Sequence, residues 1–317
     1  MSWLVTGGAG YIGAHVVRAL TAAGDDVVVV DDLSTGLAER IPDGVAFERM
    51  SLFDAAGIRR VLNDHDIDGV VHVAAKKQVA ESLREPSRYF RENVEAVRIL
   101  LDECAEAGVG SFVFSSSAAV YGHAAAAPVR EDDSCAPTTP YGQTKLAGEW
   151  LVRAVGDVAG MRTLSLRYFN VAGAGEPALA DQHATNLVPL VLSAIRRGTP
   201  PRIFGADYPT ADGTCVRDYV HVADVADAHV HAAHALAHDE LASGQVLNIG
   251  TGEGVSVRQI ITQALAITGS GLEPVVEARR PGDSPVVVAD VGTASRLLSW
   301  KATKSVTDMI ESAWQAR

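Results

Sequence analysis

The chain opens with the stretch Leu4-Val5-Thr6-Gly7-Gly8-Ala9-Gly10-Tyr11-Ile12-Gly13, which decides the fold. Its apolar start predicts a short buried strand, and the apolar-periodic run over residues 14–22 predicts a helix. Gly8, Gly10 and Gly13 fit the spacing G-x-G-x-x-G, and Gly7 with the last two fits the wider G-x-x-G-x-x-G. Such glycines permit a tight turn, let backbone amides approach a pyrophosphate and let the helix pack close to the strand. The stretch therefore predicts a dinucleotide-binding unit.

A second predicted strand, residues 27–30, ends in Asp31-Asp32. This is close to the offset of about 20 residues at which dinucleotide-binding units carry an acidic side chain. A carboxylate there accepts hydrogen bonds from the adenosine ribose and repels a 2′-phosphate, so the sequence favours NAD over NADP. We expect Asp31 to bind the ribose. Asp32 either contributes to the same site or only ends the strand in a turn.

A tyrosine and a lysine stand four residues apart in Tyr141-Gly142-Gln143-Thr144-Lys145. At about 100° per residue, the two side chains lie about 40° apart on a helix and point the same way. A phenol with a pKa of about 10 is a poor base at neutral pH, but a fixed positive charge beside it favours the phenolate. Tyr141 is therefore a candidate proton acceptor, although the same pair also fits the surface of an ordinary amphipathic helix.

The composition disfavours nucleic acid and membranes as partners. With 27 basic and 39 acidic residues the net charge is −12, which opposes binding to a phosphate backbone. No apolar run approaches the roughly 20 residues that span a bilayer. Because the first predicted strand begins within five residues of Met1, we expect no signal peptide. Three widely spaced cysteines show neither a disulfide framework nor a zinc spacing. We expect a cytoplasmic protein.

Four histidines lie close together in one segment, at His229, His231, His234 and His238. The last two are four residues apart and so share a helix face, but no third acidic or thiol ligand is obvious beside them. We expect a surface or interface face there and no metal site.

Alternating strand and helix signals predict an α/β fold with a doubly wound parallel sheet, Rossmann-type, covered by helices on both faces. The expected strands are 45–48, 69–74, 111–115 and 163–167, and the expected helices are 55–64, 87–107 and 141–158. At 317 residues the chain exceeds the usual size of one core, and after residue 169 the pattern turns glycine-rich and proline-punctuated. We assign residues 1–170 plus about 216–240 to an NAD-binding domain, and 171–215 and 241–317 to a smaller α/β domain that includes the strand 246–249.

Five motifs resemble those of one known family. They are the glycine stretch 7–13, the run Ser115-Ser116-Ser117-Ala118-Ala119-Val120-Tyr121-Gly122, the run 141–145, the run Arg167-Tyr168-Phe169-Asn170, and the run from Ile203 to Thr214 continued by Val216 to His221. Together they resemble the UDP-galactose 4-epimerase family of the extended short-chain dehydrogenase/reductase superfamily, over nearly the whole chain. The resemblance implies an isomerase in which bound NAD oxidises the sugar at C4, the ketose turns in its pocket, and the hydride returns to the opposite face.

The resemblance also implies roles for individual residues. Tyr141 would exchange the C4 hydroxyl proton, Lys145 would lower the phenol pKa and bond the nicotinamide ribose, and Ser117 would hold the C4 oxygen. The implied NAD contacts are Gly7, Gly10, Tyr11, Ile12, Gly13, Asp31, Asp32, Leu33, Ser51, Leu52, Val73, Ala74, Ala75, Lys77, Asn93, Ser115, Tyr141, Lys145 and Tyr168. The implied contacts with the UDP-sugar substrate are Lys77, Ser117, Tyr141, Asn170, Asn186, Leu187, Phe204, Arg217, Arg280, Asp283 and Val287.

The sequence leaves alternatives for individual residues, for the reaction and for the oligomeric state. Lys76 competes with Lys77 for the phosphates, and Ser51 stands where the family often has an aspartate that meets the adenine. Val287 is a small residue where the family varies, so acceptance of N-acetylated UDP-hexosamines is a hypothesis. The alternatives are a dehydratase or decarboxylase on the same scaffold and a non-catalytic NAD sensor, and a homodimer is expected through the helices 87–107 and 141–158.

Overall fold

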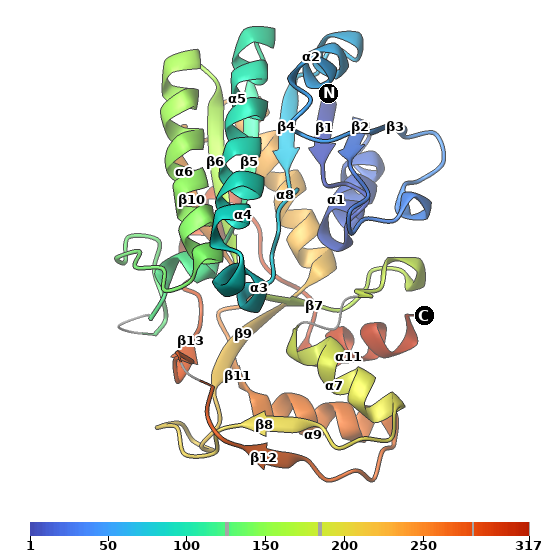
Figure 1. Cartoon of the computed structure of the whole chain (residues 1–317), viewed down its shortest axis with the longest axis vertical. Helices are drawn as coiled ribbons and strands as arrows, with labels where there is room; N and C mark the ends of the chain where they lie inside the picture. Colours follow the sequence, from blue (N-terminus) through green and yellow to red (C-terminus); the bar gives the residue numbers. More distant parts are fainter. Residues whose placement is uncertain (124–126, 183–185, 281, 317) are drawn as a thin grey trace.

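The computed structural model describes residues 1–123, 127–182, 186–280 and 282–316, arranged as a larger and a smaller unit (Figure 1). A seven-stranded, all-parallel sheet forms the centre of the larger unit, in the order β10-β6-β5-β4-β1-β2-β3. Its strands are β1 (Ser2–Thr6), β2 (Asp26–Asp31), β3 (Ala46–Arg49), β4 (Gly69–His72), β5 (Ser111–Ser117), β6 (Arg162–Tyr168) and β10 (Gln245–Ile249). The order reverses between β1 and β4, and such switch points are where open α/β sheets bind ligands.

Helices cover both faces of this sheet, as a doubly wound fold requires. One core cluster joins the sheet to α1 (Tyr11–Ala22), α8 (Val222–Ala237) and α10 (Gly292–Leu298). The other joins it to α2 (Ala55–Asp64), α5 (Ala96–Ala107) and α6 (Pro140–Ala159). Because the strands are buried on both sides, they read in the sequence as nearly continuous apolar runs such as Val27 to Val30. The predicted fold class is confirmed.

The smaller unit is built around short strands and three helices. Strand β9 (Val216–His221) pairs with β7 (Asn170–Ala172), β11 (Gly254–Ser256) and β13 (Val286–Val287), while β8 (Arg202–Phe204) pairs with β12 (Val275–Glu277). The helices are α7 (Leu187–Arg196), α9 (Val257–Thr268) and α11 (Val306–Gln315), and their apolar faces meet β7 and β9 in a separate core. Figure 1 shows this unit below the carboxyl ends of the large sheet.

The chain crosses between the units more often than expected. The assignment of residues 246–249 to the smaller unit is wrong, because β10 pairs with β6 in parallel and buries Leu247 and Ile249 in the large core. Helix α8 packs on the large sheet as expected, but β9 before it belongs to the small sheet. Helix α10, expected in the smaller unit, also packs on the large one through Ala294 and Leu298. A strand's local pattern does not specify which sheet it joins.

The predicted helix 87–107 is interrupted. It comprises α4 (Pro86–Phe90), a π-helical turn (Arg91–Glu95) and α5, and it is preceded by α3 (Val79–Arg84). Short π-helical insertions occur often at functional sites. This one turns Asn93 inward, where its side chain is buried.

Among the described residues, no helix combines the length and the apolar content that crossing a bilayer requires.

Candidate active site

Glycines shape the turn between β1 and α1. Gly7 has a φ of +72°, in the left-handed region that favours glycine. A Cβ on Gly13 would lie 2.0 Å from the carbonyl oxygen of Gly7, so the helix can start this close to the strand only with glycine at that position. The N-cap of α1 is Gly10, which has no side chain with which to bond the first-turn amides. These amides suit an anion such as a pyrophosphate.

Tyr11 and Ile12 begin α1, and their side chains pack within the protein. Tyr11 donates its hydroxyl hydrogen to the carbonyl oxygen of Gly173 over 2.6 Å, which ties α1 to the smaller unit. Ile12 packs against the large core. The structure thus leaves their backbone amides, rather than their side chains, as the expected contacts with a cofactor.

The two aspartates after β2 have different environments. Asp31 is buried, and its carboxylate accepts from the backbone amides of Ala9 at 3.1 Å and Leu33 at 2.8 Å. Burial raises the pKa of Asp31, while these two amides lower it. Leu33 itself has a φ of +59°, an unusual conformation for a leucine at a strand end. Asp32 is exposed and accepts from the amide of Ser34 at 2.8 Å, so it ends the strand in a turn.

The chain after β3 and β4 approaches the same edge of the sheet. The exposed Ser51 accepts from the amide of Phe53 at 3.2 Å, and Leu52 packs on the core. The amides of Val73 and Ala74 both donate to the carbonyl oxygen of Thr6 at 3.1 Å. Ala74 in turn lies so close to Gly7 that a Cβ on Gly7 would be 2.7 Å from its Cα. Ala75 follows, half-buried.

Asn93 fixes the segment that carries the two candidate lysines. Its side chain accepts from the amide of Lys76 at 2.8 Å and donates to the carbonyl oxygen of Lys76 at 2.9 Å and to Thr144 at 3.1 Å. Lys76 donates to Ser34 at 3.1 Å, while the amine of Lys77 lies 3.8 Å from Asp181. Lys76 therefore reaches toward the end of β2, and Lys77 reaches toward the smaller unit.

The tyrosine and the lysine point inward from the start of α6. Thr139 caps the helix by accepting from the amide of Gly142 at 3.2 Å, so Tyr141 lies in the first turn. Tyr141 and Lys145 are both buried, and the amine of Lys145 donates to the carbonyl oxygen of Ser115 at 2.7 Å. Ser117 ends β5, and its hydroxyl accepts from the amide of Ala119 at 3.2 Å.

Burial shifts the pKa values of both Tyr141 and Lys145. Burial raises the pKa of the Tyr141 phenol, and the hydroxyl of Ser117 is the group that lowers it. Burial also lowers the pKa of Lys145 from 10.5 to about 8, against an opposing effect of the Glu149 carboxylate. In this geometry the ammonium group of Lys145 is aimed at the carbonyl oxygen of Ser115, and its effect on the phenol pKa stays a prediction.

His229 is buried and hydrogen-bonds to Ser115. The expectation that it lies on a surface or interface face is therefore wrong. Because its Nδ1 donates to the carbonyl oxygen of Val225, its Nε2 accepts from the hydroxyl of Ser115 at 2.9 Å. Burial lowers the pKa of His229 to about 4. Tyr168, at the end of β6, has its ring centre 6.1 Å from that of His229. His234 instead meets Asp25 at 2.7 Å, and no group of three potential metal ligands occurs among the residues described.

A cleft of about 830 Å³ opens in the smaller unit. The cleft is lined by seven of the residues expected to contact a UDP-sugar, namely Asn170, Asn186, Leu187, Phe204, Arg217, Arg280 and Asp283. The guanidinium carbon of Arg280 lies 3.8 Å from the ring centre of Phe204. Arg217 donates to the carbonyl oxygen of Ser284 at 2.8 Å and has its Nη2 3.8 Å from Asp283. Two guanidinium groups at one cleft suit a doubly charged pyrophosphate.

The cleft adjoins the carboxyl edge of the large sheet, because the chain runs directly from one to the other. Only Phe169 separates the end of β6 at Tyr168 from the start of β7 at Asn170. Phe169 belongs to a small apolar cluster with Val120 and Tyr121, against which Val287 also packs. The predicted residues thus fall into two neighbouring groups, one at the carboxyl ends of the parallel strands and one in the cleft.

Part of the cleft wall is formed by residues outside the predicted site. Tyr219 lines the cleft from β9, and Val188 and Val191 line it from α7. Tyr219 could be predicted from the sequence, because side chains two residues apart on a strand share a face and Arg217 is a predicted cleft residue. The sequence gives no such indication for the two valines, because an apolar helix face predicts packing in the core.

Comparison with known proteins agrees with this arrangement. Residues 3–250 match the NAD dependent epimerase/dehydratase family. The chain belongs to this family. The UDP-glucose 4-epimerase of Azospirillum brasilense is 44% identical over 302 residues, which are 94% of this chain and 86% of that protein. The resemblance drawn from the motifs is confirmed.

Solved structures of family members are similar along the whole chain. The crystal structure of UDP-glucose-4-epimerase from Stenotrophomonas maltophila with bound NAD and formylated UDP-arabinopyranose has a TM-score of 0.95 and 39% identity, covering 99% of this chain and 97% of that one. The UDP-Glc/GlcNAc 4-epimerase from Campylobacter jejuni has a TM-score of 0.88 and 33% identity, covering 99% and 98%.

Proposed function

We propose that this chain is an NAD-dependent isomerase that interconverts UDP-galactose and UDP-glucose by inverting C4. One observation carries the proposal: Tyr141, Lys145 and Ser117 meet at the carboxyl edge of a dinucleotide-type sheet, next to a cleft whose walls carry two arginines. The names of its relatives support the same activity and the same cofactor.

The residues at the sheet edge fit NAD. The uncapped first turn of α1 suits the pyrophosphate, and the buried carboxylate of Asp31 suits the adenosine ribose while opposing a 2′-phosphate. When bound, oxidised NAD supplies a hydride acceptor that returns the same hydride, so the reaction needs no second substrate. The larger unit is proposed as the NAD domain and the smaller as the UDP-sugar domain.

The chain's own residues then move one proton and hold the substrate. Tyr141 would take the proton of the C4 hydroxyl and later give it back, and Ser117 would bind the C4 oxygen and lower the phenol pKa. Arg217 and Arg280 would hold the pyrophosphate. Because affinity resides in the nucleotide, the sugar can turn without leaving.

The alternative reactions lack residues at the required place. A dehydratase of this superfamily carries an Asp-Glu pair beside its active-site serine or threonine. In this chain the corresponding place, after Ser117, is the start of the short helix η3 (Ala118–Tyr121), which begins with two alanines. Elimination would have no proton carriers there. A decarboxylase or a silent NAD sensor would leave UDP-galactose unchanged, so product analysis distinguishes either of them from an epimerase.

The test compares wild type with Tyr141→Phe, using purified holoenzyme and UDP-galactose. Loss of a general acid–base group should lower kcat about 100- to 10,000-fold with little change in KM. Tyr208→Phe is the control, because it also removes a buried phenol hydroxyl but keeps the ring that Arg279 covers. If Tyr141→Phe interconverts the sugars at the wild-type rate, the mechanism is wrong.

We also propose that N-acetylated UDP-hexosamines are substrates. Val287 is half-buried and packs against the cluster of Val120, Tyr121 and Phe169, so its small side chain leaves room near the sugar. The Campylobacter jejuni relative is named for both kinds of substrate. Val287→Tyr should abolish turnover of UDP-N-acetylgalactosamine and retain that of UDP-galactose. Complete rejection of the acetylated sugar by wild type would contradict the proposal.

A homodimer and a cytoplasmic location complete the proposal. Trp150 and Val158 on α6 are 67% and 90% exposed, and Phe90 on α4 is 41% exposed. Such apolar exposure suits pairing through these helices. Trp150→Glu should shift the sedimentation coefficient to that of a monomer, and an unchanged value would oppose this interface. The three cysteines are free, as is usual in a reducing compartment.

A further inference from the structure

A buried ion pair fastens the catalytic helix to the sheet. Glu149 on α6 and Arg167 on β6 form two parallel hydrogen bonds, Nε to Oε1 at 2.9 Å and Nη2 to Oε2 at 2.6 Å. Both side chains are only 5% exposed. Two parallel bonds between planar groups restrict direction as well as distance. The pair therefore restricts how α6 can rotate or slide against β6.

Glu149 shares a helix face with the residues that do the chemistry. It lies four residues after Lys145 and eight after Tyr141, and each four-residue step turns a helix by only about 40°. Its Oε1 also accepts from the hydroxyl of Ser116, the neighbour of Ser117, at 2.5 Å. One carboxylate thus bonds to both strands that flank the catalytic edge.

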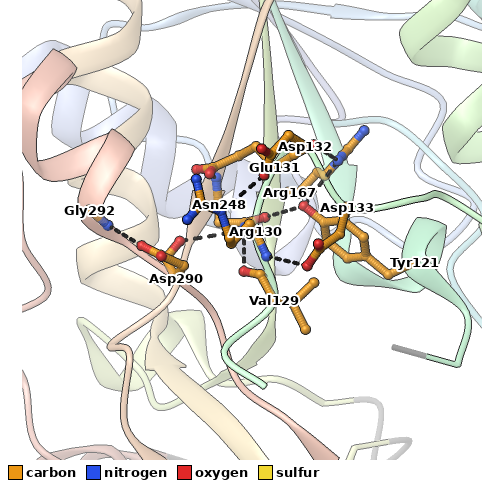
Figure 2. Close-up of polar contacts among 10 residues, drawn as sticks. All are labelled: Tyr121, Val129, Arg130, Glu131, Asp132, Asp133, Arg167, Asn248, Asp290 and Gly292. Carbon is orange, nitrogen blue, oxygen red and sulfur yellow. Dashed lines mark hydrogen bonds and ion pairs between the residues drawn. The ribbon is translucent and has the colours of Figure 1, made fainter. Parts of the chain in front are cut away.

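The guanidinium group of Arg167 extends the connection further. Figure 2 shows it beside Tyr121 and the loop that contains Glu131. Its Nη1 donates to the hydroxyl of Tyr121 at 3.0 Å and to the carbonyl oxygen of Glu131 at 3.3 Å, and Tyr121 donates to Asn248 on β10 at 2.7 Å. Asn248 in turn donates to the carbonyl oxygen of Val129 at 2.9 Å. A wider hydrogen-bond network thus extends from Arg167 to Tyr121 and Asn248, and the ion pair with Glu149 connects this network to α6.

We propose that Glu149 and Arg167 are positioning residues for the epimerisation, holding Tyr141 and Lys145 on α6 opposite Ser117 on β5. The inference rests on the proposed function. The pair touches neither NAD nor substrate in this assignment and acts through the placement of α6. A displacement of about 1 Å in a reacting group can cost about 100-fold in rate, so loosening this contact should lower kcat.

The first experiment compares Glu149→Gln with Glu103→Gln in the purified holoenzyme. Glu103 is a matched control because it is also buried and bonded twice to an arginine, Arg59, but it joins α5 to α2. Glu149→Gln should lower kcat for UDP-galactose about 10- to 100-fold, with KM within about 2-fold and NAD content unchanged. Glu103→Gln should keep kcat near the wild-type value.

The pH profile supplies a readout that a merely structural role would not move. In the described part of the chain, the titratable groups near Lys145 include Glu149 and Tyr141 on α6 and His72 on β4. His229 on α8 and Tyr168 on β6 both hydrogen-bond to Ser115, to which Lys145 also donates. Of these, the Glu149 carboxylate raises the pKa of Lys145. The expected effect of Lys145 on the phenol requires its positive charge, so loss of the Lys145 proton should set the alkaline limb of kcat. Removal of the Glu149 carboxylate should move that limb to lower pH, and Glu103→Gln should leave it in place.

A double variant keeps the inference testable if the single change unfolds the protein. Glu149→Leu with Arg167→Met removes both charges together, and buried ion pairs often tolerate apolar replacement. We expect a folded, NAD-containing enzyme with kcat still reduced at least about 10-fold. A folded double variant with kcat within 2-fold of wild type would overturn the positioning role. Wild type that leaves UDP-galactose unconverted would instead overturn the proposed function.

Discussion

Lys145→Met should make the NAD-free protein more stable at neutral pH while it abolishes turnover. The reason is that the fold buries an ammonium group, as the pKa lowered from 10.5 to about 8 by burial indicates. Below pH 8 the folded and unfolded states both carry the proton, and the folded state bears the full cost of the buried charge. A methionine of similar length fills the same space without a charge.

The size of the effect follows from the pKa. The change from 10.5 to about 8 corresponds to about 3 kcal/mol in the free energy of unfolding. Below pH 8, where the amine is charged, the lost hydrogen bond to the carbonyl oxygen of Ser115 offsets about 1.5–3 kcal/mol of this. The net gain at pH 7 is therefore small, but its pH dependence is distinctive.

The folded and unfolded states differ in the protonation of Lys145 over a defined pH range. Between pH 8 and 10.5 the unfolded state holds the Lys145 proton and the folded state does not, so wild-type stability rises by about 1.4 kcal/mol per pH unit from this group. The variant lacks this contribution. The stability difference, variant minus wild type, should therefore fall across this window and level off above it.

Urea denaturation of both NAD-free proteins at closely spaced pH values measures this difference. Lys301→Met, at an exposed position, is the control and should give a flat difference curve. A flat curve for Lys145→Met between pH 8 and 10.5, or one that rises, would refute the conclusion that the buried amine titrates in that range.

Two further predictions concern the cofactor and the nucleotide. Asp31→Asn replaces an oxygen that accepts from Ala9 or Leu33 by a donor, so the affinity for NAD should fall about 10-fold and the ratio of NAD affinity to NADP affinity should decrease. Equilibrium binding measures both affinities. An equal loss of NAD affinity in Asp32→Asn would contradict the assignment of Asp31 to the ribose. Arg280→Ala removes a guanidinium group from the cleft, so KM for UDP-galactose should rise about 10- to 100-fold while kcat stays within about 3-fold of wild type. Steady-state kinetics measures both constants. A fall in kcat at constant KM would contradict the role of Arg280 in holding the pyrophosphate.

Local patterns predicted the parts of the site that lie within a few residues of one another. The glycine turn, the aspartate at the end of β2 and the pair Tyr141 and Lys145 all follow from backbone geometry over short spans. The helix 55–64 was predicted to the residue for the same reason, because its amphipathic period is contained in its own sequence. The cleft residues, in contrast, came from family resemblance and not from any pattern in the chain.

The sequence by itself determined the fold class, the turn that suits a pyrophosphate and the two side chains that share one helix face. The tertiary structure alone decided that β10 joins the large sheet, that His229 lies buried behind Ser115, and that Glu149 meets Arg167. Each of these is a contact between elements, and periodicity records only that a residue is apolar or polar, not which partner it meets. The same limit explains the pKa of Lys145, because burial and the direction of its amine are properties of the packed protein.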